Sequence, residues 1–193
     1  TEMFRPAERA PFHAQRPIFL YAGRVSVEKN LEAFVSLDLP GSPWVVGDGP
    51  ARRGLERKFP RARFFGMKHG AELAWYFAQA DAFVFPSRTD TFGLVMLEAM
   101  ACGRPVVGTR AGAIPELVDE SVGTIAAPHD SVSLARSIED LYDRDLEALG
   151  AAARTRVLQR YTWSQVLQQQ LQTYASISRS VRALSPAVES IGL

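Results

Sequence analysis

The sequence predicts an α/β protein built on a doubly wound parallel sheet, in which helices cover both faces of the strands. Apolar runs of strand length, such as residues 17–23 and 83–85, alternate along the chain with segments whose apolar residues recur at helical spacing. The strand-length runs are apolar throughout, which is typical of strands buried on both faces. A repeated strand–helix order with such strands favours parallel pairing.

The predicted elements follow one another from residue 17 onward, punctuated by glycines, prolines and short polar loops. The expected strands are residues 17–23, 43–47, 61–65, 83–85, 105–107 and 123–125. The expected helices are residues 31–37, 50–59, 71–80, 115–118, 131–143, 145–160 and 161–177, together with one that holds Gly93 in its first turn; Asp130 is the expected cap of the helix at 131.

Size and composition describe one ordinary globular domain. The 193 residues are 47% hydrophobic and 22% charged. The 22 Lys and Arg residues nearly balance the 21 Asp and Glu residues, which argues against nucleic acid as a bulk electrostatic partner. The longest apolar runs are far shorter than the ~20 residues that cross a bilayer, and the sequence shows no signal-peptide pattern.

Cys102 is the only cysteine, so it cannot form an internal disulfide. It lies in an apolar helical segment without an accompanying histidine, and we interpret it as a small buried residue and not as a nucleophile. A single thiol is consistent with a reducing compartment, so we expect a cytoplasmic protein. His69 and His129 lie in predicted loops and are weak candidates for ligand contacts.

The central stretch, residues 83–107, suggests an anion site. A helix N-terminus offers unpaired N–H groups and a positive dipole end, so the backbone of Phe92, Gly93 and Leu94 is placed to hold an anion. Asp90 lies just before this helix and Glu98 lies inside it. Acids on either side of an anion site need hydroxyl partners, and a nucleoside diphosphate sugar offers sugar hydroxyls to Asp90 and ribose hydroxyls to Glu98.

Two cations follow the first predicted strand. Arg24 and Lys29 stand five residues apart after Gly23, at the strand's carboxyl end, where open α/β sheets bind ligands. They suit a diphosphate whose negative charge grows as a sugar leaves. A solvated loop with surface charges is an equally good interpretation of the spacing alone, and the helix start flanked by acids favours the clamp.

Three glycines near the second strand resemble a dinucleotide fingerprint only superficially. Gly47 and Gly49 would have to be followed by glycine at position 52, which is Arg52. We therefore reject a dehydrogenase and assign these glycines to a tight turn, with Asp48 as a turn or cap residue.

The run that starts at Asp90, D-T-F-G-L-V-M-L-E-A-M-A-C-G-R-P-V-V, resembles the signature of retaining glycosyltransferase family 4, also called glycosyltransferases group 1. Two acids separated by seven residues mark that family, and Asp90 stands where Glu is usual. The resemblance covers about residues 16–178. It implies the Rossmann-like, donor-binding C-terminal half of a GT-B fold.

The same resemblance divides the chain. Residues 1–16, which include an F-x-P run, correspond to the linker from an N-terminal acceptor domain that is missing here. Residues 17–160 correspond to the nucleotide-sugar binding domain, and residues 161–178 to a helix that crosses back onto the acceptor domain. We expect residues 179–193 to be a disordered tail.

The resemblance also assigns roles to residues that match the family's motifs, including G-R-x-x-x-x-K for the diphosphate clamp. The expected catalytic residues are Arg24, Lys29 and Asp90. The expected donor-phosphate contacts are Phe92, Gly93 and Leu94, with Gly23 in the phosphate-side loop, and Glu98 is the expected ribose contact. The expected nucleobase loop, whose backbone would contact the base, is Gly66, Met67, Lys68 and Gly70.

The function that the resemblance implies is retaining transfer of a hexose from a nucleoside diphosphate sugar, with UDP favoured and GDP next. No metal is expected, because cations and N–H groups stabilise the departing diphosphate. The T-D-T-F-G variant suggests a glycolipid acceptor, and the missing domain would supply peripheral contact with the inner face of a membrane. The isolated domain is expected to bind donor without turning it over.

Two alternatives remain open. One is a non-catalytic nucleotide-sugar binding module or regulatory half. The other is a nucleotide-sugar epimerase of the same architecture, which would need an acid–histidine constellation that the sequence does not show.

Overall fold

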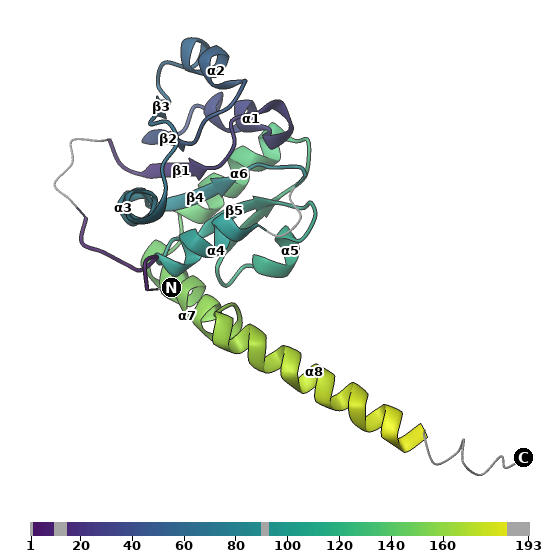
Figure 1. Ribbon diagram of the computed structural model, residues 1–193. Coiled ribbons are helices and arrows are strands. Elements are labelled where there is room, and N and C mark those ends of the chain that lie inside the picture. Colours follow the sequence, from purple (N-terminus) through teal and green to yellow (C-terminus); the bar gives the residue numbers. More distant parts are fainter. Residues whose placement is uncertain (1, 10–14, 90–92, 185–193) are drawn as a thin grey trace, which may run out of the picture.

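The computed structural model of the protein describes residues 2–9, 15–89 and 93–184 (Figure 1). Six parallel strands form one sheet in the order β3-β2-β1-β4-β5-β6. The strands are β1 (Ile18–Ala22), β2 (Ser42–Val46), β3 (Arg63–Phe64), β4 (Ala82–Phe85), β5 (Val106–Thr109) and β6 (Gly123–Ala126). The predicted doubly wound parallel sheet is therefore confirmed.

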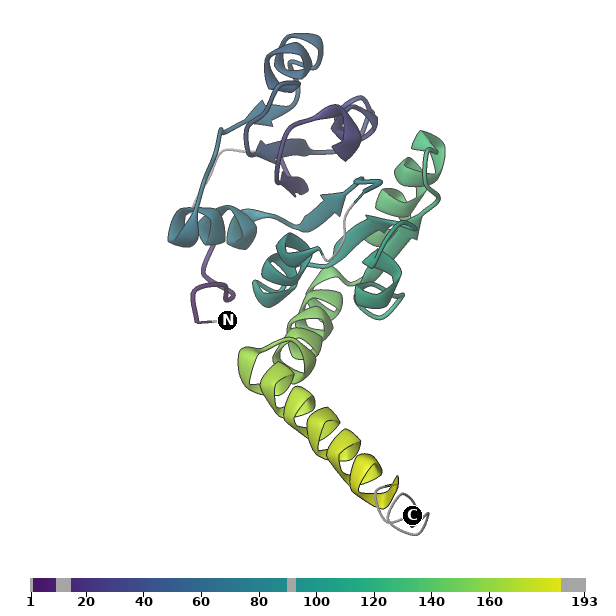
Figure 2. The ribbon, with the colours of Figure 1, turned by 45° about the vertical axis from the view of Figure 1, so that its right-hand side comes forward.

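Helices cover both faces of the sheet (Figures 1 and 2). The bounds are η1 (Val27–Lys29, a 3-10 turn), α1 (Leu31–Val35), α2 (Arg52–Lys58), α3 (Gly70–Gln79), α4 (Leu94–Ala101), α5 (Ile114–Leu117), α6 (Ser131–Tyr142), α7 (Leu146–Arg160) and α8 (Trp163–Leu184). One face carries α1 and α6, which contact each other, and the opposite face carries α3 and α4. None of these described helices is long and apolar enough to cross a membrane.

The strands are as buried as their apolar sequences predict. Every residue of β1, β2, β4 and β5 is buried. Large rings fill the centre, among them Phe19, Trp44 and Phe83, each at most 1% exposed. Full burial on both faces explains why these runs lack polar alternation.

Most helix bounds differ from the prediction by one or two residues, and Gly93 precedes α4 instead of lying in its first turn. Two differences have a clear physical reason. Helix α2 begins at Arg52 and not at Pro50, because a turn precedes it in which the Arg52 N–H donates to the Gly49 carbonyl at 3.1 Å. Helix α8 continues to Leu184, so residues 179–184 are helical where a disordered tail was expected. The first strong helix breaker after residue 163 is Pro186, which explains the longer helix. The Asp130 cap is confirmed: its side chain accepts the Ser133 N–H at 2.9 Å.

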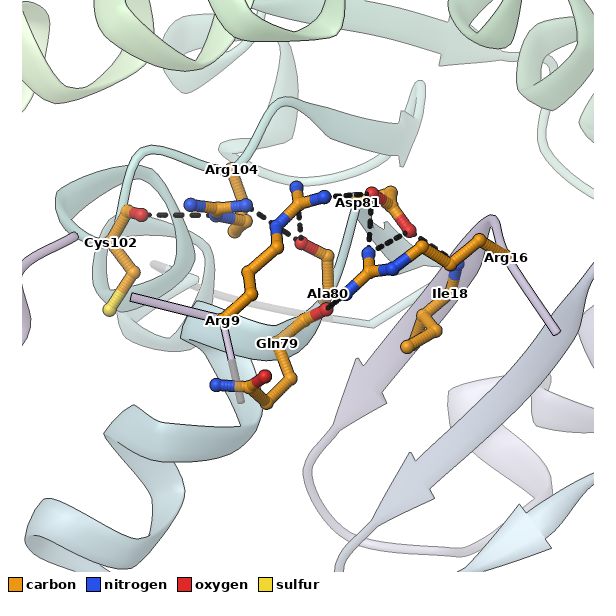
Figure 3. A network of polar contacts seen from close by, with 8 residues as sticks. All are labelled: Arg9, Arg16, Ile18, Gln79, Ala80, Asp81, Cys102 and Arg104. Carbon is orange, nitrogen blue, oxygen red and sulfur yellow. Dashed lines mark hydrogen bonds and ion pairs between the residues drawn. The ribbon is translucent and has the colours of Figure 1, made fainter. Parts of the chain in front are cut away.

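The described parts of the predicted linker, residues 2–9 and 15–16, form no helix or strand, but they are fastened to the domain (Figure 3). The guanidinium groups of Arg9 and Arg16 both bind the Asp81 carboxylate at 2.8 Å, and the Ile18 N–H donates to it at 2.7 Å. The Phe4 ring meets the Phe77 ring edge-on at 6.0 Å between centroids. The Asp81 side chain is only 10% exposed, and a carboxylate so buried needs such partners.

Arg104 completes this network at the amino edge of the sheet. Its side chain donates to the carbonyl of Cys102 at 3.0 Å and to that of Ala80 at 2.8 Å (Figure 3). These carbonyls belong to the residues that follow α3 and α4, whose negative dipole ends lie at this edge. The arginines here thus stabilise helix ends and Asp81, on the opposite edge from the predicted donor site.

Candidate functional site

The predicted cations lie at the topological switch point of the sheet. The chain runs from β1 to β2 on one side, and β4 adjoins β1 on the other. Ligands of open α/β sheets bind outside the carboxyl ends of the strands at this point. Arg24 and Lys29 follow β1, and the connection that leads to α4 follows β4. The fold therefore brings the two predicted motifs to one place.

Arg24 is exposed and Lys29 is half-buried. The Tyr21 hydroxyl donates to the Arg24 carbonyl at 2.7 Å. The Lys29 Nζ lies 5.9 Å from the centroid of the Phe85 ring, at the end of β4. A cation at this distance is attracted by the negative face of the ring. Lys29 thus connects the end of β4 with the loop after β1.

Glycines draw three strand ends together. The Gly23 N–H donates to Val46 at 3.0 Å, and the Gly47 N–H donates to Gly66 at 2.8 Å. Gly47 has φ 138°, and a Cβ there would lie 1.8 Å from the Gly23 carbonyl oxygen. Gly49 approaches Val25 in the same way. Gly49 begins the turn that precedes α2, since its carbonyl accepts the Arg52 N–H, whereas Gly47, which the sequence also assigned to a turn, lies before it. None of these glycines places a side chain at this edge.

Gly93 caps α4 in the left-handed region, with φ 73°. It is buried, and a Cβ there would lie 2.2 Å from the Met96 Cε and 3.3 Å from the Leu117 Cδ1. The helix proper begins at Leu94, whose N–H belongs to the first turn and has no acceptor within the helix. The predicted Asp90 and Phe92 lie outside the described residues.

Glu98 is half-buried one turn into α4. Burial raises the pKa of its carboxyl group, because the charged form loses water. It lines a groove with residues from both ends of the chain, including Met3 and Trp163. The Met3 Sδ also lies 3.7 Å from the position that a Cβ of Gly70 would take. The N-terminal segment therefore borders both the predicted ribose residue and the predicted nucleobase loop.

The predicted nucleobase loop connects β3 with α3. Gly66 and Gly70 have positive φ, and Met67 is 52% exposed. The Lys68 ammonium pairs with the Glu72 carboxylate, which raises the pKa of Lys68. It also lies 6.0 Å from the centroid of the Tyr76 ring. Both contacts hold the Lys68 side chain against α3.

The two loop histidines are exposed and the cysteine is buried, as the sequence predicted. His69 and His129 are exposed, and His129 Nδ1 lies 2.9 Å from an Arg88 nitrogen. Cys102 is fully buried, and burial raises its pKa to about 12, so it remains a thiol. Within the described part of the chain, no group of three His, Cys, Asp or Glu side chains could hold a metal ion.

Sequence reasoning missed two features of this edge. One is the contact of Tyr21 with Arg24, since the apolar run predicts only that Tyr21 is buried. The other is Ser87, just beyond β4: it is fully buried, and its hydroxyl has no hydrogen-bond partner among the described residues. The Ser87 carbonyl accepts a bond from the Thr109 hydroxyl. The Pro86-Ser87 turn was a visible signal for the position, but not for the burial of the hydroxyl.

The parallel sheet with a glycine-lined, cation-bearing carboxyl edge defines a Rossmann-like α/β domain. The sequence matches the family described as "Glycosyl transferases group 1" over residues 16–144. The chain therefore belongs to the group 1 glycosyl transferases, enzymes of GT-B architecture, as the motif predicted.

Several curated proteins are similar in sequence. A sulfoquinovosyl transferase of Arabidopsis thaliana is 39% identical over 162 residues, which cover 77% of this chain and 31% of that protein. A glycogen synthase of Mycobacterium tuberculosis is 32% identical over 201 residues, covering 93% and 49%. A GDP-mannose-dependent alpha-mannosyltransferase of Corynebacterium glutamicum is 33% identical over 161 residues, covering 81% and 39%. The chain thus spans a third to a half of the length of these relatives.

Solved structures share the fold. A sucrose-phosphate synthase of Thermosynechococcus elongatus superposes with a TM-score of 0.80 at 28% identity, over 93% of this chain and 51% of that one. The C-terminal domain of a group 1 glycosyl transferase of Francisella tularensis gives 0.69 at 23% identity, over 84% and 97%. An Anabaena protein solved with UDP-glucose gives 0.70 at 24% identity, over 83% and 49%. At these lower identities the likeness concerns the fold alone.

Proposed function

We propose that this chain binds the nucleoside diphosphate of a sugar donor and is the donor-binding half of a retaining hexosyltransferase that needs no metal. UDP is the favoured nucleotide and GDP the next. Arg24 and Lys29 would stabilise the departing diphosphate, together with the N–H groups at the start of α4. Glu98 would bind the ribose, and Asp90 would orient the sugar.

One observation supports this proposal: two cations follow β1 and the start of α4 follows β4, and these neighbouring strands lie on either side of the switch point of the sheet. The transfer step builds negative charge on the leaving diphosphate. Fixed positive groups at that point lower the energy of the transition state more than that of the bound donor. Arg24 and Lys29 follow β1, the Leu94 N–H lies at the start of α4, and positive charge is thereby available without a metal.

The relatives support sugar transfer but differ in what they use and make. Their names include a GDP-mannose-dependent enzyme and a glycogen synthase. UDP is the first probe here because the fold is shared with a protein solved with UDP-glucose.

For the acceptor we propose a glycolipid at the inner face of a membrane, reached from the cytoplasm through an acceptor domain; the T-D-T-F-G motif supports it.

Calorimetric titration of the 193-residue chain with UDP, GDP and ADP tests the proposal, without and with magnesium. We expect saturable binding of UDP, or of GDP in its place, that magnesium leaves unchanged. Lys29→Ala should weaken this binding by about 10-fold, because one charge-assisted contact to phosphate is lost. Lys58→Ala is the matched control: Lys58 pairs with Glu32 on the surface, away from the switch point, and its loss should leave binding unchanged.

Binding of none of the three nucleotides would contradict the proposal. Equal weakening by Lys29→Ala and Lys58→Ala would contradict the clamp and point to unspecific attraction. In a full-length enzyme, Lys29→Ala should lower turnover by about 100-fold or more, as for the loss of one preorganised electrostatic contact. A chain that binds the nucleotide but belongs to a full-length protein without sugar transfer would be a binding module.

A further inference from the structure

We propose that Tyr21 is a positioning residue for the diphosphate clamp: its hydroxyl fixes the backbone of Arg24, and its ring supports the site of Lys29. The inference rests on the proposed function, because it names what holds that function's two cations in place. Neither the family motif nor the sequence pattern assigns a role to this tyrosine.

The hydroxyl group is the first part of the argument. Tyr21 is fully buried in β1, and its hydroxyl donates to the Arg24 carbonyl at 2.7 Å. It also lies 3.1 Å from where a Cβ of Gly23 would be. The bond thus reaches over the strand end and ties down the residue that follows it. The Gly23 and Val25 N–H groups donate to the carbonyls of Val46 and Asp48, so the tyrosine hydroxyl fixes the one carbonyl that lies between these two bonds.

The ring is the second part. The Tyr21 ring stacks on the Phe85 ring with 6.3 Å between centroids and 11° between planes. Phe85 is 2% exposed and lies under Lys29, whose Nζ is 5.9 Å from its centroid. The buried Tyr21 side chain therefore contacts the Arg24 carbonyl with its hydroxyl and, with its ring, the Phe85 ring on which Lys29 lies. Arg24 and Lys29 belong to one loop, and Tyr21 links them through these contacts as well.

Tyr21 cannot itself touch a donor, because it has no exposed surface. Its effect must pass through Arg24 and the loop. This predicts a specific pattern: loss of the hydroxyl should weaken the contact that Arg24 makes with phosphate, and should leave contacts at the ribose end unchanged. A general loosening of the fold would instead affect both ends.

A double-mutant cycle separates the two cases. The probe is UDP, or GDP where the unchanged chain prefers it, titrated calorimetrically against the 193-residue chain. Tyr21→Phe should weaken binding by about 3- to 10-fold, which is the range for one hydrogen bond. In the Arg24→Ala background the same change should have no further effect, because there is no cation left to position. In the Glu98→Ala background it should keep its full effect.

Tyr142→Phe is the matched control. Tyr142 packs edge-on against Phe19 of β1, the strand that also holds Tyr21, but Tyr142 is 43% exposed and lies away from the clamp. The affinity for UDP should therefore not change. Thermal unfolding of each variant checks that it is folded.

Unchanged affinity in Tyr21→Phe would overturn the inference and leave the proposed function standing. Equal losses in the Arg24→Ala and Glu98→Ala backgrounds would also overturn it, since they would show general loosening. Failure of the unchanged chain to bind UDP, GDP or ADP would contradict the proposed function, and this inference with it.

Discussion

At the scale of single residues, the carboxyl group of Glu98 occupies a partly buried position that does not favour its charged form. Glu98 is half-buried, burial raises the pKa of its carboxyl group, and the carboxylate makes no hydrogen bond or ion pair with another described residue. The folded state therefore holds the proton more tightly than the unfolded state does. The favourable contribution to stability is present below the ordinary pKa of glutamate and is lost as the pH rises through the higher, folded-state pKa.

This linkage gives a prediction for Glu98→Gln. At pH 7 the variant should unfold at a temperature about 1–3 °C higher, because an uncharged amide avoids the cost of burying a carboxylate. Near pH 4 the gain should shrink, since the carboxyl of the unchanged protein is then largely protonated in both states. Calorimetric unfolding at the two pH values measures the difference, and Glu116→Gln, at an exposed position, is the control.

The same variant should bind UDP more weakly if Glu98 accepts bonds from ribose hydroxyls. Greater stability with weaker binding is the pattern of a residue kept for function. A variant that is less stable than the unchanged protein at pH 7 would show that Glu98 has a structural partner, and the interpretation of the raised pKa would be wrong.

At the scale of elements, the N-terminal segment is held by one acid. Asp81 precedes β4 and binds Arg9, Arg16 and the Ile18 N–H at once (Figure 3). Asp81→Ala should lower the free energy of unfolding by about 1–3 kcal/mol, chiefly because the buried Ile18 N–H loses its acceptor, while water can replace the carboxylate at the partly exposed guanidinium groups. Trypsin should then cleave rapidly after Arg9 under native conditions, before the domain is digested, whereas the bond after Arg16 resists trypsin because Pro17 follows it.

Asp38→Ala is the control for this prediction. Asp38 also pairs with an arginine, Arg61, but its side chain is 91% exposed, so its loss should change stability little. Equal protease resistance of Asp81→Ala and the unchanged chain would mean that Phe4 and its neighbours hold the segment without the ion pairs.

The sequence predicted the elements better than the contacts between them. Runs such as residues 18–22 are apolar throughout, and this pattern depends only on local composition, so strand and parallel pairing could both be inferred. Asp81 and its partners Arg9 and Arg16 are more than sixty residues apart in the chain, and no local pattern joins them. The sequence therefore predicted only an unstructured linker, and it did not reveal that Asp81 binds this segment.

In the candidate site, too, some residues could be predicted from the sequence and others could not. Arg24 and Lys29 could be placed because their strand end and their motif are both visible in the sequence. The Tyr21 hydroxyl could not, because an apolar run shows that a side chain is buried and not which carbonyl it reaches. Asp90, the acid on which the family motif begins, lies outside the described residues, and its role stays a prediction.

At the scale of the whole molecule, helix α8 stands apart from the sheet domain. It extends away from the body beyond α7 (Figure 1). Its large apolar residues are exposed: Trp163 by 81%, Leu171 by 68% and Tyr174 by 66%. By contrast, α7 is anchored, since Arg154 and Arg156 donate to the carbonyls of Ala101 and Leu117. The body of the domain should therefore be stable without α8.

Truncation after Thr162 tests this division. The shortened chain should unfold within about 3 °C of the full chain, because exposed apolar side chains contribute almost no burial to stability. The amides of α8 in the full chain should exchange their hydrogens much faster than those of β1 and β4. A large fall in the unfolding temperature, or slow exchange along α8, would show that the helix packs on the domain in solution and that its apolar residues are covered there.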